Sequence, residues 1–493
     1  MSADLLLRAV RVAGAGRELL PTDEPVDILI RDGVIADIAP SGNLKVRGEV
    51  FDGDGSWVIP GLWDHHVHTV QWALTAQREP LHDAVSAADA ADRMSRVAPL
   101  TDGRRIGTGF RDALWPDDPS LDLLDRATGD VPTYLLNADV HSVWLNTAAL
   151  RREGLEGQDD DGLLREEQAF EISRRLNAVD DAMADEAVAA ASRRAAARGV
   201  VGLVDFDMGW NAGAWARRLE AGFDLHRVEF AVYPHHLEQA IAEGLRTGEA
   251  LGESDLVRMG ALKVIADGSL GTRTAACSHG YDDAPANHGA LTVPPERLHE
   301  LLGRAAAAGI EAAVHAIGDL AVTAALDAFT DTRQAGTIEH AQLVRHADLA
   351  RFARLGVAAS VQPWHAMDDQ ALVARLWAGQ TSIAYPIASL HAAGAGIRFG
   401  SDAPVTPLDP WMAISAAVTR QGADGVPWHP EESVDIDVAL RASSRHGTDG
   451  SSAVTPGAAA DLAVCGKDPL TADASALRAM PIAATFVAGR RTH

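Results

Sequence analysis

The sequence is poor in cysteine and has no long apolar run. Its two cysteines, Cys277 and Cys465, form no Cys-x-x-Cys pair, which argues against a disulfide framework or a cysteine-based metal site. No apolar run is long enough to span a bilayer. The N-terminal residues also lack the basic and apolar regions of a secretory signal. We therefore expect a cytoplasmic protein without a membrane-spanning segment.

Positive charge is also scarce. The 493 residues include 43 basic and 69 acidic side chains, which gives a net charge of −26. Nucleic acids and anionic membranes bind basic surfaces, so we expect neither as a partner and predict a small-molecule substrate instead. The length allows a large barrel and a smaller domain. The oligomeric state stays open, and a homo-oligomer is compatible with the sequence.

Lysine is the rarest charged residue, with only three among the 43 basic side chains. Lys45 and Lys467 have polar neighbours and are typical of the surface. Lys263 lies instead in the middle of an apolar segment, where a charge is costly to bury. Arginine cannot lose its charge, whereas lysine can lose its proton or be modified. This contrast makes Lys263 a candidate functional residue.

Eight apolar segments that end in polar residues are separated, in many places, by alanine-rich helical stretches. Apolar strands alternating with helices are typical of parallel sheets, and eight of them predict an α/β protein with a (β/α)8 TIM-like barrel. The predicted strands are 58–68, 200–206, 227–233, 261–267, 311–315, 336–340, 357–362 and 396–402. Catalytic groups of such barrels lie at the carboxyl ends of the strands.

The remaining segments predict two additions to the barrel. Short strands in residues 1–56 and 456–493 favour one small β domain built from both termini. The barrel would then occupy residues 57–455. Residues 70–199 are too many for one connection, so we expect them to form an insertion after the first barrel strand that covers the barrel mouth.

The first predicted strand ends in an unusual cluster, Asp-His-His-Val-His, at residues 64–68. Alternation along a strand places Asp64, His66 and His68 on one side, and His65 and Val67 on the other. Two imidazoles two residues apart on one face can bind one cation. Histidines that only form hydrogen bonds at a polar strand end would give the same pattern. The role of His65 stays open.

Other predicted strands carry further candidate site residues: Lys263 lies within the fourth strand, and His315, His340 and Asp402 end the fifth, sixth and eighth. Neutral imidazoles and carboxylates suit zinc and similar divalent ions. Such a cation lowers the pKa of bound water towards ~7 and so provides hydroxide at neutral pH. A nearby carboxylate can take the proton and deliver it to a leaving amine, and Asp402 is our candidate for this role. A bare ammonium at Lys263 would repel the cation.

Several motifs resemble the amidohydrolase superfamily and, within it, amidohydrolase family 3, which includes N-substituted formamide deformylases. The resemblance extends over nearly the whole chain, and the segment Lys263–Ala275 is the match most specific to this group. The other similar motifs are Pro60–His68, Val314–Asp319, Ile338–Gln342, Ser360–Pro363, Phe399–Val405 and Pro456–Leu462. The last of them resembles the return into the small β-sandwich domain that this superfamily builds from both termini, so the resemblance implies a β-sandwich from residues 1–56 and 456–493. The chain departs from the group pattern at His65, after Leu155, and at Arg441–Ser452.

The resemblance implies a ligand set for one or two divalent metal ions per chain, with zinc as the expected metal. His66 and His68 would bind one ion, and His315 and His340 the other. Lys263, carboxylated by carbon dioxide, would bridge the two ions. Asp402 would bind the first ion and act as acid and base.

Substrate contacts and the reaction itself are less constrained. Six residues near predicted loops at the mouth are candidate substrate contacts, although packing or loop capping explains each equally well: His141, Trp144, Arg273, Gln362, Trp364 and His365. We expect a metal-dependent hydrolase that cleaves a C–N bond of an amide, N-formyl or cyclic amide group. A deaminase, an ester or carbamate hydrolase, and a non-catalytic binding barrel remain alternatives.

Overall fold

A computed structural model describes the chain except for residues 1–3, 15, 18–23, 111, 113–114, 138–141, 156, 158–160, 166 and 423–424. The chain divides into two compact units. One unit combines Met1–Thr69 with Ser192–His493, and the other is Val70–Ala191. No helix among the described residues is both long enough and apolar enough to cross a membrane.

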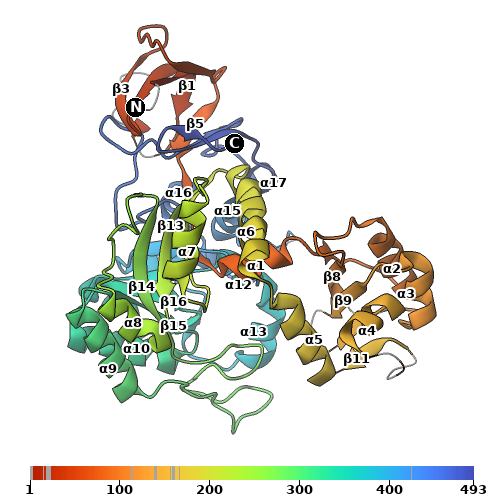
Figure 1. The fold of residues 1–493 in the computed structure, drawn as a ribbon. Coiled ribbons are helices and arrows are strands. Elements are labelled where there is room, and N and C mark those ends of the chain that lie inside the picture. Colours follow the sequence, from red (N-terminus) through yellow and green to blue (C-terminus); the bar gives the residue numbers. More distant parts are fainter. Residues whose placement is uncertain are drawn as a thin grey trace. The chain divides into compact units, whose positions relative to one another are not determined.

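The first unit contains an eight-stranded parallel barrel (Figure 1). In sheet order its strands are β6 (Leu62–Val67), β12 (Val200–Asp205), β13 (Arg227–Val232), β14 (Val257–Ile265), β15 (Glu311–Ala316), β16 (Gly336–His340), β18 (Val357–Val361) and β20 (Ile397–Phe399). The first and last strands meet just beyond their carboxyl ends, where the His68 N–H donates to the Ala403 carbonyl at 2.9 Å. The predicted (β/α)8 fold class is therefore confirmed.

Amphipathic helices pack on the barrel strands. Helix α9 (Pro295–Ala307) buries Leu298, Leu301, Leu302 and Ala305, a spacing that puts one apolar stripe on its inner face. It packs against β15, as α7 (Asn211–Glu220) does on β13 and α11 (His346–Leu355) on β18. Other helices of the unit are α8 (Leu237–Ala242), α10 (Asp319–Thr332), α12 (Pro363–Asp368), α13 (Gln370–Leu376), α14 (Ile387–Ala392), α15 (Pro410–Thr419), α16 (Ile436–Ala442) and α17 (Ala474–Arg478).

Strands from both termini form a second, strand-rich part of the same unit (Figure 1). They pair in the order β23-β22-β21-β5-β1-β2-β3, with β4 beside β1. These strands are β1 (Leu5–Val12), β2 (Val26–Arg31), β3 (Val34–Pro40), β4 (Glu49–Asp52), β5 (Trp57–Pro60), β21 (Leu462–Cys465), β22 (Ile482–Val487) and β23 (Arg490–Arg491). Apolar side chains from both ends of the chain share one core cluster, which includes Leu7, Ile28, Leu462 and Phe486.

The predicted strand 58–68 is two strands, separated by Gly61. β5 pairs with β1 and β21 in the terminal sheet, whereas β6 pairs with β12 in the barrel. A side chain at Gly61 would place its Cβ only 2.3 Å from the Cγ1 of Val201. The chain passes from one sheet to the other here because glycine permits this close approach.

The second unit, Val70–Ala191, has its own five-stranded sheet in the order β11-β10-β9-β8-β7. Its strands are β7 (Glu79–Pro80), β8 (Arg105–Phe110), β9 (Thr133–Asn137), β10 (Ser142–Leu145) and β11 (Leu163–Arg165). Helices α2 (Ala87–Arg96), α3 (Leu121–Thr128), α4 (Thr147–Glu153) and α5 (Glu167–Asn177) accompany the sheet. The unit confirms an insertion after the first barrel strand, and its placement over the barrel mouth stays a prediction.

Candidate metal centre

The centre begins where β6 and the segment after β20 run side by side. The Asp402 N–H donates to the His66 carbonyl at 2.7 Å, which brings the two side chains together. The Nε2 atoms of His66 and His68 lie 3.4 Å and 3.3 Å from the same Asp402 oxygen. One ligand atom from each of these three residues lies within 4.8 Å of the others. Three donors at this spacing fit one cation.

The second pair of predicted histidines lies beside the first. The ring centroid of His340, at the end of β16, is 4.8 Å from that of His66 and 4.5 Å from that of His315 on β15. His315 Nε2 lies 3.3 Å from the Gly268 carbonyl oxygen. Burial, followed by the charge of Lys263, lowers the pKa of His315 to about 4. This imidazole is therefore neutral near pH 7, the form that binds metals.

Lys263 on β14 lies beside His66. Its side chain is 2% exposed, and its Nζ lies 3.3 Å from His66 Nε2 and 4.1 Å from the ring centroid of Phe206. Burial lowers the pKa of Lys263 to about 8, although the carboxylates of Glu339 and Asp402 act in the opposite direction. A part of the population then carries a neutral amine, which is the form that reacts with carbon dioxide.

Two buried side chains orient His66 and His340, two of the candidate ligands. His66 Nδ1 donates to Glu339 Oε2 at 2.7 Å, because a carboxylate can only accept. His340 Nδ1 donates to Gln362 Oε1 at 2.8 Å. Both hydrogen bonds place the ring proton on Nδ1 and leave Nε2 without a proton, which is the form of the nitrogen that can bind a cation. The sequence analysis did not assign a role to Glu339, although it is a buried carboxylate in a strand next to His340.

The charge on Asp402 is strongly stabilised. Burial alone would raise the pKa of its carboxyl group, but His66, His68 and His340 outweigh burial and hold the pKa well below its usual value. The backbone of the centre is strained at two positions, because Asp402 and His340 adopt left-handed conformations with φ of 56° and 74°. Such a conformation costs a non-glycine residue about 1–2 kcal/mol. The fold bears this cost where it directs two side chains into the centre.

A divalent cation fits this set of residues. The donors are imidazole nitrogens and a carboxylate, which zinc and similar ions prefer. In addition, His68 Nδ1 and His365 Nε2 are buried and have no hydrogen-bond partner within the described part of the chain. Buried polar atoms of this kind need an explanation, and a ligand held in the centre supplies one for His365.

The structure places the six candidate substrate contacts in different surroundings. His365 contributes to a second group of potential metal ligands with His340 and Asp402, and Gln362 contacts His340. Arg273 is paired with Asp283 at 2.7 Å. Trp144 lies buried in a core cluster of the second unit, and His141 lies outside the described residues.

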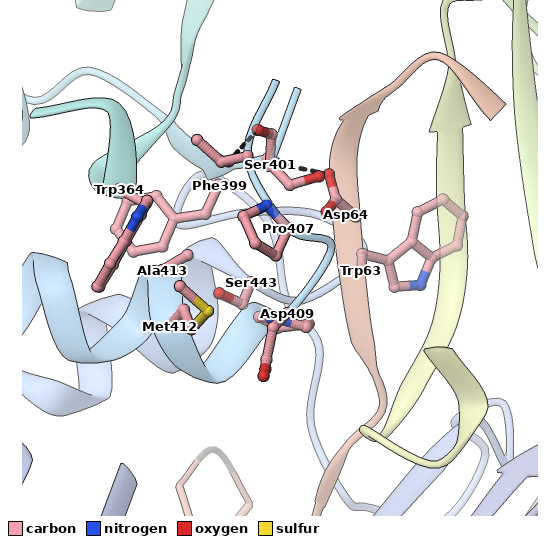
Figure 2. A pocket seen from close by; sticks show the side chains of 13 residues that line it. Trp63, Asp64, Trp364, Phe399, Ser401, Pro407, Asp409, Met412, Ala413 and Ser443 are labelled. Atoms are coloured by element: carbon pink, nitrogen blue, oxygen red, sulfur yellow. Dashed lines mark hydrogen bonds between the residues drawn. The ribbon is translucent and has the colours of Figure 1, made fainter. Parts of the chain in front are cut away.

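Trp364 and Asp64 line a separate small pocket between β20, β6 and α15 (Figure 2). The Asp64 carboxylate accepts from the backbone N–H groups of Ser401, at 2.9 Å, and His66, at 3.1 Å. It therefore supports the two segments that form the centre. His65 is not part of either ligand group and bonds the Ser444 carbonyl oxygen at 2.9 Å.

Comparison with known proteins gives consistent matches along the chain. Amidohydrolase YtcJ of Bacillus subtilis (strain 168) is 27% identical over 95% of this chain and 96% of its own length. An N-substituted formamide deformylase of Arthrobacter pascens is 25% identical over 94% of each chain. The crystal structure of a metal-dependent hydrolase from Pyrococcus horikoshii OT3 superposes with a TM-score of 0.81 at 25% identity, covering 96% of this chain and 99% of the other. The model of the amidohydrolase family matches residues 49–493, so this chain belongs to the amidohydrolase family.

Proposed function

We propose that this protein, a metal-dependent hydrolase of the amidohydrolase family, cleaves a C–N bond in an amide, N-formyl or cyclic amide substrate. The observation that carries the proposal is the contact of one Asp402 oxygen with both His66 and His68. It puts a proton acceptor directly beside two cation ligands. The similarity to an N-substituted formamide deformylase supports the choice of bond.

The ligand set we propose has two halves. His66, His68 and Asp402 would hold one divalent cation, and His315 and His340 a second, with Lys263 as a carbamate between them. Zinc is the metal we propose. When bound, such a cation lowers the pKa of a water molecule and polarises the substrate carbonyl.

Asp402 then transfers the proton in two steps. It accepts a proton from the attacking water as the water oxygen bonds to the carbonyl carbon. When the C–N bond breaks, Asp402 delivers this proton to the departing nitrogen. The products are a carboxylic acid and an amine, which are formate and an amine for an N-formyl substrate. The ionised form of Asp402, which the neighbouring histidines favour, is the one that the first step needs.

A substrate panel together with total metal analysis tests the proposal. The panel contains N-alkylformamides, N-acyl amines, cyclic amides, ring amines, esters and carbamates. It is scored for released amine, ammonia and alcohol. We expect stoichiometric divalent metal, release of amine with carboxylic acid, and loss of activity on chelation that zinc restores. Protein without metal that stays inactive after metal addition would contradict the proposal, as would turnover of only esters or ring amines.

A further inference from the structure

His365 is a buried histidine that neither the fold nor the proposed ligand set uses. It lies in α12, which follows β18, and it is 7% exposed. Its Nε2 is buried and has no hydrogen-bond partner among the described residues. A buried imidazole usually has a partner for each nitrogen that water cannot reach. The free nitrogen of His365 is therefore available to a group that arrives from outside the protein, and its place beside Asp402 distinguishes it from other unpartnered nitrogens.

The backbone holds His365 firmly in position. Its own N–H donates to the Gln362 carbonyl at 3.1 Å, and its carbonyl accepts from the Asp369 N–H at 2.8 Å. The neighbouring Ala366 and Met367 are part of an apolar core cluster. Gln362 in turn contacts His340 of the centre. These contacts connect the start of α12 to the end of the barrel wall, so the imidazole is preorganised.

His365 approaches Asp402 with a different partner from the histidines of β6. One of its ring nitrogens lies within 4.8 Å of ligand atoms of His340 and Asp402, whereas His66 and His68 form a group of their own with Asp402. The two groups share Asp402 and no histidine. The ring of His365 is parallel to that of His340, with 6.3 Å between the centroids and 9° between the planes. His365 therefore lies next to the proton acceptor without occupying the position of the His66–His68 pair.

We propose that His365 is a catalytic residue that donates a hydrogen bond to the carbonyl oxygen of the substrate as that oxygen becomes an oxyanion. The inference deepens the proposed function and rests on it. As the water oxygen adds to the carbonyl carbon, the carbonyl electron pair moves to oxygen, and the His365 N–H stabilises this charge. When the C–N bond breaks, the electron pair returns and the hydrogen bond weakens. A preorganised donor of this kind contributes 10²–10³-fold to kcat in other enzymes.

The test compares H365Q and H365F in the full-length zinc-loaded protein. Glutamine keeps an N–H donor near the position of Nε2, whereas phenylalanine keeps the ring shape and removes the donor. Methylphosphonate, a tetrahedral anion, is the probe in isothermal titration calorimetry. We expect unchanged zinc content in both variants, about tenfold or greater loss of methylphosphonate affinity in H365F, and a smaller loss in H365Q. On an active substrate, kcat should fall roughly 10²-fold in H365F while KM changes little.

H226N is the matched control, because His226 is also a buried histidine with an unpartnered Nδ1, but its Nε2 bonds the Ser192 carbonyl and it belongs to neither group of potential metal ligands. It should bind methylphosphonate like the wild type. Loss of zinc from both His365 variants would make His365 a metal ligand and overturn the proposal. Equal methylphosphonate affinity in wild type and H365F would also overturn it. If no wild-type substrate is found, the proposed function fails, while the calorimetric comparison still tests the donor.

Discussion

Two kinds of buried histidine occur in this protein, and their partners differ. His65 and His226 each bond a single backbone carbonyl, of Ser444 and Ser192, at 2.9 Å and 3.0 Å. His66 and His340 instead bond buried side-chain oxygens through Nδ1, and their rings lie beside each other. The first kind bonds the backbone and belongs to neither group of potential metal ligands. In the second kind, Nε2 carries no proton and lies beside Asp402 or another imidazole.

The pKa does not separate the two kinds. Burial lowers the pKa of His65 to about 3 and that of His226 to about 4. Burial also lowers the pKa of His66 and His340 well below the usual value, with Lys263 as the next cause for His66 and His315 for His340. A lowered pKa reports desolvation in all four. The identity of the ring's partner and the direction of the second nitrogen distinguish a candidate ligand from a structural histidine.

The largest effect is expected from Asp402, the residue that both ligand groups share. D402N keeps the shape but removes the charge and the proton acceptor. We expect kcat to fall roughly 10³-fold, within the range for a lost general acid and base. H65N, which alters a histidine of the structural kind, should keep its metal and most of its activity once folding is verified by circular dichroism. Unchanged hydrolysis in D402N would remove the acid–base assignment.

A variant of Lys263 tests whether a group on this lysine bridges the two metal ions that the second kind of histidine would bind. K263A should lose one of two metal ions, measured by inductively coupled plasma mass spectrometry, and most of its activity. Short carboxylic acids such as acetate should restore part of both, because they replace the carbamate. A K263A protein that retains both ions and shows no rescue would contradict the bridging role. K467A, at a lysine outside the barrel strands, is the control.

A variant of Glu339 tests whether the side chain that accepts the hydrogen bond of His66 affects metal binding. E339Q keeps an oxygen near His66 Nδ1 but removes the charge. We expect metal affinity to fall 10–100-fold, as for other carboxylates behind a ligand histidine, measured by competition with a chromophoric chelator. S360A is the matched control, because the Ser360 hydroxyl is buried near the same cavity and has no partner within the described structure. Equal affinities of E339Q and wild type would show that the shape of the site, and not this carboxylate, orients His66.

The strands were predictable because each one buries a nearly continuous apolar run, which is a local property of the sequence. The predicted segment 336–340 coincides with β16, and 357–362 with β18 apart from its last residue. The break at Gly61 was not predictable from local pattern, since apolar residues stand on both sides of it, in β5 and in Leu62 and Trp63 at the start of β6. Only the pairing of β5 with β21, some 400 positions later in the chain, separates them.

The centre was predictable only in part for a similar reason. Residue type and strand end point to His66 and Asp402, whose positions relative to the barrel follow from the fold. The role of Glu339 depends on a contact with a residue 273 positions away, which no local pattern contains. Trp364 was expected as a substrate contact because it lies near a predicted loop at the mouth, and this role stays a prediction. In the structure α12 starts at Pro363, and the indole lines the pocket beside α15 (Figure 2).

The smallest effect concerns stability and the structural histidine His226. Its pKa of about 4 in the folded protein lies below the usual 6.5 because burial disfavours the charged ring. Above pH 6.5 the His226 ring is neutral in both the folded and the unfolded state, and its full contribution to the free energy of unfolding is present. As the pH falls from 6.5 to 4, His226 binds a proton in the unfolded state but stays neutral in the folded state. The free energy of unfolding therefore decreases, by about 3 kcal/mol at most. H226Q should reduce this loss, measured as the difference between the slopes of unfolding free energy against pH for the two proteins. Equal slopes between pH 4 and 6.5 would show that His226 accepts a proton without unfolding, and the comparison between the two kinds of histidine would then rest on geometry alone.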